Sequence, residues 1–413
     1  MKIRRKYLFY VLAFTAAIIS AFNSGIDATV SSLFVQDGWA LAFATFAVGI
    51  PVTLVLSLVF SIPLKGRSFG SRIADPSFKR LRLLRREEVF PQTMAALGNA
   101  LYTVGYFALF VLIEDPSVVL PFTQVVILYL VTIEAINDKD MPTLSEIQSI
   151  LIVTFGAILG SLSLSGSLNL ESLLIVFFVI NPGWVLLTIY QRKLKWTKID
   201  GQYNDSINIR FWNVLFSCVM TAFLIFVYDR TMGSNHLAAG VAASVTQFWW
   251  IALISFGAFF AFVFYIRALG IGKASVVQAV RSSTIMFSIP ISLFIASLGI
   301  IEPFSFDPVL LTIKAIGIII MMLGIVSFAL NLVKAYIFIR VKPGYPLDET
   351  MQKLWNIRGV TRVTATAGKY DFIVKIRIRA LVKGYEKIIR RVEDIKAIDS
   401  YKWESVLKEW EDI

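Results

Sequence analysis

The hydropathy of the chain changes abruptly near Lys334. The residues before it form long apolar segments separated by short polar ones, whereas residues 336–413 are rich in charges of both signs. The whole chain is 57% hydrophobic and only 16% charged, with a mean hydropathy of +0.71, which leaves too few polar residues to cover a soluble protein. We therefore predict a membrane domain at residues 1–334 and a water-exposed domain at residues 335–413.

Ten segments are apolar over about the 20 residues that a helix needs to cross the core of a bilayer. They cover residues 7–32, 40–64, 92–113, 116–135, 146–166, 171–191, 211–229, 245–268, 274–298 and 309–333. Basic residues gather in alternate connections: the loop at 65–91 carries eight, whereas the intervening loops carry only Arg230. The connection after the sixth segment is flanked by Arg192, Lys193, Lys195, Lys198 and Arg210. Because Lys and Arg are enriched in cytoplasmic loops, this pattern predicts ten transmembrane helices with both termini in the cytoplasm. We expect the protein in the cell membrane of a prokaryote.

Several classes of function are disfavoured by composition. The formal net charge of +12 follows the loops rather than a stripe, so it does not indicate nucleic-acid binding. The single Cys218 and the single His236 disfavour a disulfide framework and a Cys/His metal site. The sequence has no phosphate-binding glycine loop and no recognisable nucleophile–base pair. We expect no catalytic residues, no metal and no cofactor, and hence a protein that is not an enzyme.

The two halves of the membrane domain share local patterns. Residues 116–119 read Pro-Ser-Val-Val and residues 274–277 read Ala-Ser-Val-Val, each at the start of an apolar segment. Chance similarity between apolar sequences is the alternative explanation. Five segments per copy is an odd number, so a second copy would insert upside down. We predict an inverted repeat, with copies at residues 7–166 and 171–333, as in many transporters that bind substrate between the copies.

Residues 96–164 and 252–330 resemble the EamA-type repeat of the drug/metabolite transporter superfamily. The resemblance consists of an aromatic helix, the turn into Ser-Val-Val and a glycine-bearing fifth helix, and in the second copy it includes Pro290 and Glu302. The first copy departs from the pattern, since it lacks the matching proline and has Pro121 earlier instead. The resemblance implies a 5+5 transporter fold and does not identify a substrate.

Polar residues within the apolar segments are the candidate transport site, because ionisable groups at membrane depth usually face a cavity or a partner. Arg281, two helical turns into its segment, suits the carboxylate or phosphate of an anionic substrate. The alternatives are a side chain that reaches back to the interface and polar groups that only join helices. The predicted cavity residues are Arg281, Gln278, Asn23, Asp27, Asn99, Tyr102, Gln124, Asn181 and Trp184.

Beyond Lys334, the pattern alternates between strand and helix periods. Strands are expected at 336–341, 360–366, 371–379 and 400–407, and helices at 347–355 and 382–396. This β-α-β-β-α-β order is that of a ferredoxin-like, split βαβ domain, which makes the whole chain a polytopic helical membrane protein with an α+β cytoplasmic domain.

This segment resembles the Lrp/AsnC ligand-binding domain, also called the RAM domain. The match includes Gly359-Val360 and the run from Thr366 to Phe372, which is close to the family's Thr-Gly-x-Tyr-Asp turn. Ala367, and Ala397-Ile398 in place of a second Gly-Val, depart from the family. Such domains pair through their sheets and bind amino acids or related molecules near the turn, which implies a regulatory site at Gly368, Tyr370 and Asp371. A structural role for Gly368 and Asp371, with a domain that only dimerises the protein, is the alternative.

The sequence thus predicts a secondary transporter, most simply an exporter, of amino acids or related small metabolites. Its expected partners are the small-molecule substrate, an amino-acid effector, the lipid bilayer, and a second copy through the C-terminal domain, as a homodimer or higher homo-oligomer. The alternatives are a non-transporting membrane-anchored sensor and a flippase for a lipid-linked anionic substrate. A transcription factor is not expected, because no helix-turn-helix precedes the C-terminal domain.

Overall fold

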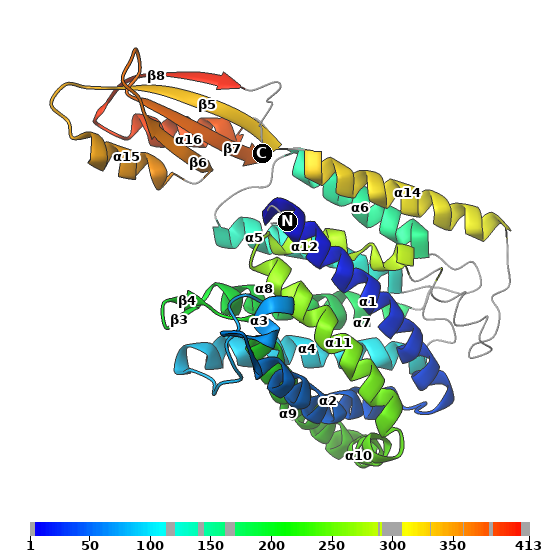
Figure 1. The fold of residues 1–413 in the computed structure, drawn as a ribbon. Helices are drawn as coiled ribbons and strands as arrows, with labels where there is room; N and C mark the ends of the chain where they lie inside the picture. The colour runs from blue at the N-terminus through cyan, green and yellow to red at the C-terminus, as the bar shows by residue number, and fades with distance from the viewer. Residues whose placement is uncertain are drawn as a thin grey trace. The chain divides into compact units, whose positions relative to one another are not determined.

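The computed structural model separates into two compact units. It describes residues 5–112, 120–138, 144–161, 170–287, 290, 308–330, 332–357, 359–379 and 383–405. One unit comprises Met1–Asp140 and Ile152–Leu323, and the other comprises Met141–Leu151 and Gly324–Ile413. We call them the helical unit and the sheet unit, and Figure 1 shows the elements of each. Glu302 of the expected second repeat lies outside the described residues.

The helical unit is built from long helices joined by short connections. Its elements are α1 (Arg5–Leu33), α2 (Gly38–Ser61), α3 (Phe69–Ile73), α4 (Arg86–Leu112), η2 (Leu120–Val125), α5 (Val126–Asp138), α7 (Leu170–Ile175), η3 (Val176–Ile180), α8 (Asn181–Trp196), α9 (Ser206–Met232), α10 (His236–Thr246), α11 (Phe248–Leu269) and α12 (Ala274–Arg281). Two further helices, α6 (Leu144–Ser161) and α14 (Pro308–Leu330), contribute residues to both units.

Five helical segments among the described residues are long and apolar enough to cross a membrane. They are Leu8–Ser31, Gly38–Ser61, Leu173–Trp196, Ser206–Met232 and Phe248–Leu269. Large apolar side chains on their outer faces are exposed, including Val55, Val219 and Phe223. The other predicted spans each overlap a helix, but the described residues do not show ten transmembrane helices.

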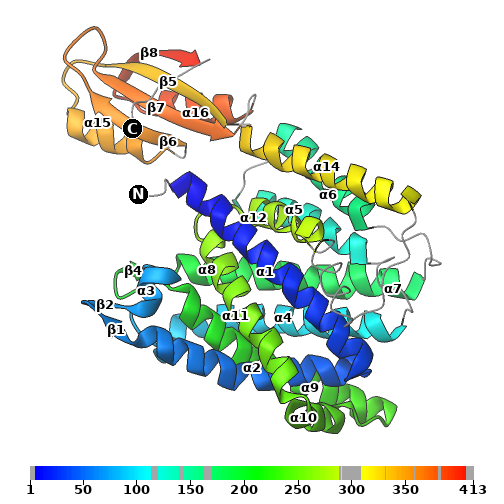
Figure 2. The same cartoon turned by 45° about the vertical axis from the view of Figure 1, so that its right-hand side comes forward.

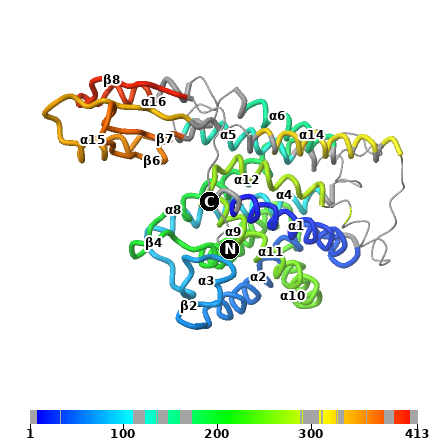
Figure 3. Tube along the Cα trace, turned by 45° about the horizontal axis from the view of Figure 1, so that its top comes forward, coloured from blue at the N-terminus to red at the C-terminus, as the bar shows by residue number. Residues whose placement is uncertain are grey.

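The segments that the sequence suggested as loops carry structure of their own. Two short hairpins, β1 (Pro63–Leu64) with β2 (Arg67–Ser68) and β3 (Lys198–Ile199) with β4 (Gln202–Tyr203), follow α2 and α8. Both turns have two consecutive residues with positive φ, Lys65-Gly66 and Asp200-Gly201, as hairpins of two-residue loops require. The hairpins and α3 lie at one end of the helical unit, and α10 lies at the other (Figures 2 and 3). We call the first the hairpin end.

The helical segment around Asn181-Pro182-Gly183 is irregular. In the structure, the five-residue π-helix η3 ends at Ile180 and α8 continues directly from Asn181 within the span Leu173–Trp196, so Pro182 lies inside a continuous helical segment and donates no backbone hydrogen bond there. Gly183 lets α8 approach α4 closely, because a Cβ there would lie 2.8 Å from the backbone nitrogen of Tyr102. The irregular segment therefore brings Trp184 beside α4.

The sheet unit contains the expected β-α-β-β-α-β order. Its elements are β5 (Leu332–Val341), α15 (Leu347–Trp355), β6 (Val360–Ala365), β7 (Phe372–Arg379), α16 (Lys383–Glu393) and β8 (Ile398–Ser405). The strands are antiparallel to their neighbours in the order β6-β7-β5-β8. Alternate residues of the strands, such as Ile337 and Val374, form one core with Leu354 of α15 and Ile388 of α16, so both helices cover the same face. β5 begins four residues before the expected strand at 336, and it pairs with β7 from Leu332 onward.

Candidate functional site

Arg281 lies at the end of α12 among aromatic side chains from two other helices. The carbon of its guanidinium group is 4.2 Å from the centre of the Trp184 ring and 5.2 Å from that of Tyr265. One terminal nitrogen donates to the Ser20 hydroxyl at 3.3 Å. No carboxylate in the described part of the chain forms an ion pair with Arg281, so its charge is stabilised by ring faces rather than by an acid. We call Arg281, Trp184, Tyr265, Tyr102 and Gln278 the Arg281 cluster.

The structure brings several of the predicted cavity residues together in this cluster. The indole nitrogen of Trp184 donates to the Gln278 side-chain oxygen at 3.0 Å, and the Tyr102 ring lies 4.6 Å from the Trp184 ring. Gln124 contacts the same region, because its side-chain oxygen accepts a 2.7 Å hydrogen bond from Ser282, which follows Arg281. Trp184, Tyr265 and Gln278 are buried, whereas Arg281 and Tyr102 are partly exposed. Three side chains of the cluster are thus buried, whereas its cation is partly exposed.

The predicted residues of α1 line the same helices from the other side. Asn23 donates to the backbone oxygen of Ile254 on α11 at 2.9 Å, and Ser20, one turn before it, accepts from Arg281. Asp27 lies one turn further along α1, and its Oδ1 atom is buried without a hydrogen-bond partner in the described part of the structure. The acid Asp27 and the cation Arg281 therefore lie on two helices, α1 and α12, that contact each other.

Two predicted cavity residues lie elsewhere or are buried. Asn99 donates to Asn213 and to Ser217, both at 3.0 Å, so it joins α4 to α9 as a helix-to-helix contact. Asn181 is fully buried at the start of α8. Neither is part of the Arg281 cluster, and for Asn99 the alternative of a polar group that joins helices fits the geometry.

Glu134, which sequence reasoning did not single out, holds the start of α12. Its carboxylate accepts hydrogen bonds from the backbone nitrogens of Ala274 and Ser275 at 2.7 and 3.1 Å, and from the Ser275 hydroxyl at 2.5 Å. It also forms a 2.6 Å ion pair with Arg192 of α8. An acid at a helix N-terminus accepts hydrogen bonds from N–H groups that have no partner within the helix, and its negative charge interacts favourably with the helix dipole. Glu134 therefore fixes the helix that carries Gln278 and Arg281.

A buried ionic network occupies the hairpin end. Lys195 donates to Asp75 at 2.5 Å, and Asp75 also accepts from the backbone and the hydroxyl of Ser206. Burial alone would raise the pKa of Asp75, but the Lys195 charge and these hydrogen bonds together hold it below its usual value. Beside it, burial raises the pKa of Asp205 to about 6, although Asn208 donates two hydrogen bonds to that carboxylate.

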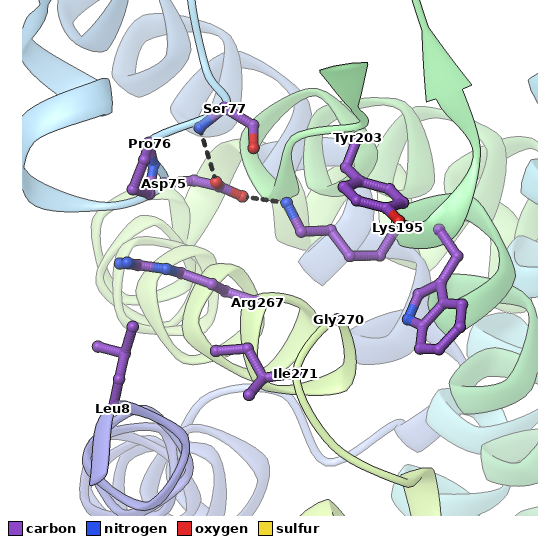
Figure 4. A pocket seen from close by; sticks show the side chains of 10 residues that line it. Leu8, Asp75, Pro76, Ser77, Lys195, Tyr203, Arg267, Gly270 and Ile271 are labelled. Carbon is purple, nitrogen blue, oxygen red and sulfur yellow. Dashed lines mark hydrogen bonds and ion pairs between the residues drawn. The ribbon is translucent and has the colours of Figure 1, made fainter. Parts of the chain in front are cut away.

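A pocket of about 270 Å³ opens beside this network (Figure 4). It is lined by Leu8, Asp75, Pro76, Ser77, Lys195, Trp196, Tyr203, Arg267, Gly270 and Ile271. Its charges have partners within the protein: Lys195 pairs with Asp75, and Arg267 donates to the backbone oxygen of Ala74 at 2.6 Å. These contacts join α8, α9, α11 and the segment after α3. The charged groups of the pocket therefore hold these elements together at the hairpin end.

In the sheet unit, the predicted regulatory residues surround the turn between β6 and β7. Asp371 accepts from the backbone nitrogen of Val341 at 2.7 Å, so its carboxylate ties β7 to the end of β5. The Tyr370 ring lies 5.4 Å from that of Phe338. Gly368 is exposed, its φ is not in the left-handed region, and an added Cβ would meet nothing within 4 Å. The alternative structural role thus fits Asp371, while the turn itself does not require glycine at position 368.

The comparisons identify the family of the sheet unit only. Residues 334–412 match the Lrp/AsnC ligand binding domain. Among solved structures, Escherichia coli AsnC is 20% identical over 32% of this chain and 77% of its own, with a TM-score of 0.19, and MtbAldR is 19% identical over 32% and 74%, also at 0.19. A further crystal structure covers 77% of this chain and 96% of its own at 12% identity, with a TM-score of 0.49. No curated protein matches the chain.

Residues 334–412 are therefore an Lrp/AsnC ligand-binding domain. The preceding region is mostly helical, with five long apolar helices among the described residues, and its family is not identified.

Proposed function

We propose that the chain is a secondary transporter of the drug/metabolite type, with ten transmembrane helices in an inverted 5+5 repeat and both termini in the cytoplasm. Five full-length apolar helices with exposed apolar faces support membrane insertion. The basic residues of the segments that form the hairpin end support a cytoplasmic position for that end. The proposed activity of the helical unit is transport without an enzymatic step and without a cofactor.

The observation that carries the proposal is the state of Arg281. It is a cation inside a helix bundle, held by the Trp184 and Tyr265 rings, without a carboxylate partner in the described part of the chain. A charge within a membrane-spanning helix bundle is costly unless it has a partner, so such groups commonly bind a substrate or an ion. The planar guanidinium can bind a carboxylate through two parallel hydrogen bonds. We therefore assign the substrate class as amino acids or related carboxylate-bearing metabolites.

The sheet unit supplies the regulatory half of the proposal. As an Lrp/AsnC ligand-binding domain, it is proposed to bind a cytosolic amino acid near Gly368 and Tyr370 and to pair with a second copy through its sheet. The simplest arrangement is that the sensed molecule is also the exported one. The chain would then export an amino acid when its cytosolic concentration rises.

Uptake by the full-length protein in proteoliposomes tests the transport proposal. Each of the twenty amino acids is offered in turn, and the Arg281→Met variant is expected to lose uptake of any that the wild type accepts. Arg281→Lys should recover only part of it, because an ammonium group cannot form the paired hydrogen bonds. Arg230→Met is the matched control, since Arg230 also lies over an aromatic ring, Phe226, but is exposed.

Two outcomes would contradict the proposal. Unchanged uptake by Arg281→Met would show that Arg281 does not bind the transported substrate. Amino-acid binding by the full-length protein without uptake of any amino acid would leave a membrane-anchored sensor instead.

A further inference from the structure

Four buried polar side chains on three helices of the helical unit have atoms without a partner, and none of them belongs to the Arg281 cluster. Gln92 of α4, Gln191 of α8, and Arg210 and Asn213 of α9 are each 5% exposed or less. Together they carry six nitrogen or oxygen atoms that have no hydrogen-bond partner in the described part of the structure. Buried polar atoms are rarely left unpaired, so a concentration of them indicates a bound molecule or water.

The helix contacts place three of these side chains at one level. Gln92 donates to the backbone oxygen of Ile209, the residue before Arg210, at 3.0 Å. Phe90 lies two residues before Gln92, and Tyr190 lies directly before Gln191. The rings of Phe90 and Tyr190 are 6.0 Å apart. Gln92, Gln191 and Arg210 each lie within two turns of the end of their helix at the hairpin end. The three residues therefore lie at a similar level along their helices, near the hairpin end.

Donors predominate in this group. The unpaired atoms are Nε and Nη1 of Arg210, Nε2 of Gln191 and Nδ2 of Asn213 on the donor side, against the side-chain oxygens of Gln92 and Gln191. Arg210 has no ion pair with any described carboxylate, and its guanidinium lies 4.1 Å from the centre of the Phe262 ring. The sequence suggested that Arg210 flanked a loop, but α9 begins at Ser206 and encloses it. An unpaired cation and unpaired carboxamide donors are groups that bind an anion.

Phe262 relates this group to the Arg281 cluster. The same ring lies 5.9 Å from the Arg281 guanidinium, and it is 6.1 Å from the Trp184 ring. Two arginines from different helices thus contact one aromatic side chain of α11. The two guanidinium groups are thus linked through the Phe262 ring.

We propose that Arg210, with Gln191 and Asn213, forms a second anion-binding site between the Arg281 cluster and the hairpin end, for the carboxylate group of the transported molecule. The inference deepens the proposed function, because it adds a second position for the same group. It can nevertheless be tested separately, since anion binding is measurable in protein that transports nothing.

The test is the thermal unfolding temperature of the full-length protein in detergent, measured against sodium acetate at constant ionic strength. Acetate is the probe because it is a minimal carboxylate. Wild-type protein should be stabilised by acetate, and Arg281→Met should keep part of that stabilisation. Arg210→Met should weaken acetate binding at the second site about tenfold or more, and the Arg210→Met, Arg281→Met double variant should show no stabilisation by acetate. Arg210→Lys should keep part of the response.

Folding and specificity have their own controls. Arg210→Met should unfold at a higher temperature than the wild type without acetate, because it removes an unpaired buried charge. Gln191→Leu gives a second variant that keeps the charge, and it should weaken acetate binding by a smaller factor. Arg230→Met, on the same helix, should leave the acetate response unchanged. An Arg210→Met protein that responds to acetate like the wild type would overturn the proposal and leave ordered water as the partner of these atoms.

Discussion

Trp184 acts through both its ring and its nitrogen. The ring face stabilises the Arg281 cation, while the indole N–H orients the buried side chain of Gln278. A cation held by ring faces keeps its own N–H donors for other partners, since aromatic carbons accept no strong hydrogen bond. Only one of the Arg281 nitrogens has a side-chain acceptor in the described part of the structure, the Ser20 hydroxyl. The remaining donors are therefore available to a substrate carboxylate.

Replacing Trp184 by phenylalanine separates these two roles. Trp184→Phe keeps a ring beneath Arg281 but leaves the Gln278 oxygen without its donor. Losing one hydrogen bond of about 1 kcal/mol should raise the KM of uptake about fivefold, with a smaller change in kcat. The measurement is the KM of an accepted amino acid in proteoliposomes. Trp249→Phe is the control, because Trp249 is 82% exposed. Equal kinetics for the two variants would contradict an orienting role for the indole nitrogen.

Asp205 should make stability depend on pH in a direction opposite to most acids. Burial raises its pKa to about 6 in the folded protein, so its contribution to stability is complete below the ordinary aspartate pKa near 4 and is lost as the pH rises through about 6. Asp205→Asn keeps an N-cap residue and does not titrate. Between pH 4.5 and 7.5, the variant should therefore gain on the order of 2 kcal/mol relative to the wild type.

Chemical unfolding in detergent at several pH values measures this difference. The window starts at pH 4.5 because the pKa of Asp75 lies below its usual value, so Asp75 stays ionised there. Parallel pH profiles for wild type and variant would show that Asp205 does not titrate in this range.

Four of the five residues of the Arg281 cluster are among those predicted from the sequence, whereas Tyr265 and other buried charged residues of the helical unit are not. Arg281 and Gln278 are conspicuous because they are polar residues inside an apolar segment. Glu134, Lys195 and Arg210 read instead as ordinary charges near loops, since no periodic pattern links residues that are more than 50 positions apart. Their roles depend on which helices meet, and that information comes only from tertiary packing.

At the scale of elements, α12 is a short helix whose first turn is fixed from outside. Glu134 on α5 caps it and pairs with Arg192 on α8, so three helices meet at one carboxylate. The position of Gln278 and Arg281 along α12 then depends on a group more than one turn away from either. Movement of α5 or α8 would be passed to the cation through this contact.

Glu134→Gln should lower the free energy of unfolding by about 2 kcal/mol. The amide keeps the shape of the side chain but loses the charge that pairs with Arg192 and strengthens the bonds to the α12 backbone. Chemical unfolding in detergent measures the loss. Glu349→Gln is the control, because its ion pair with Lys353 is exposed on both sides and contributes less than about 1 kcal/mol. A loss no larger than the control's would mean that Glu134 does not hold α12.

The turn between β6 and β7 separates a structural requirement from a binding one. Gly368→Ala should leave stability within about 0.5 kcal/mol of the wild type, because neither its φ nor its surroundings exclude a methyl group. Gly344→Ala, in another turn of the same unit, should cost about 1 kcal/mol or more, since its φ is +88°. If the family's ligand site is present, Gly368→Ala should weaken leucine binding at unchanged stability. Unchanged leucine affinity would assign the ligand site to other residues.

The sheet unit was easier to predict than the helical unit. The alternation of residues 372–379 and the polar start of residues 347–355 locate β7 and α15, because strand and helix periods are local properties. Apolar segments carry less information: all faces of a buried helix are apolar, so the contacts of Asn99 with α9 and the π-helix before Asn181 have no sequence signature.

At the scale of the whole molecule, the chain places a ligand-binding domain directly after its last long helix. α14 ends at Leu330 and β5 begins at Leu332, so a proposed transmembrane helix and a central strand of the sheet are one residue apart in the sequence. Two ligand sites in one protein can be coupled only if each ligand favours one of two states of the whole chain. Such coupling has a thermodynamic signature that does not depend on knowing the path between the sites.

If the sheet unit regulates transport, coupling between the sites should be reciprocal. L-leucine should raise the affinity of the full-length protein for its transported substrate by a factor in the range of about 5 to 150, and the substrate should raise the affinity for leucine by the same factor. Both factors are measured as dissociation constants, because reciprocity does not hold for kinetic parameters. Gly368→Val should remove the leucine effect while substrate affinity without leucine stays unchanged, since position 368 lies far in the sequence from the Arg281 cluster. Leucine that stimulates uptake in wild type, while substrate leaves leucine affinity unaltered, would exclude an equilibrium coupling. The sheet unit would then act through dimerisation alone.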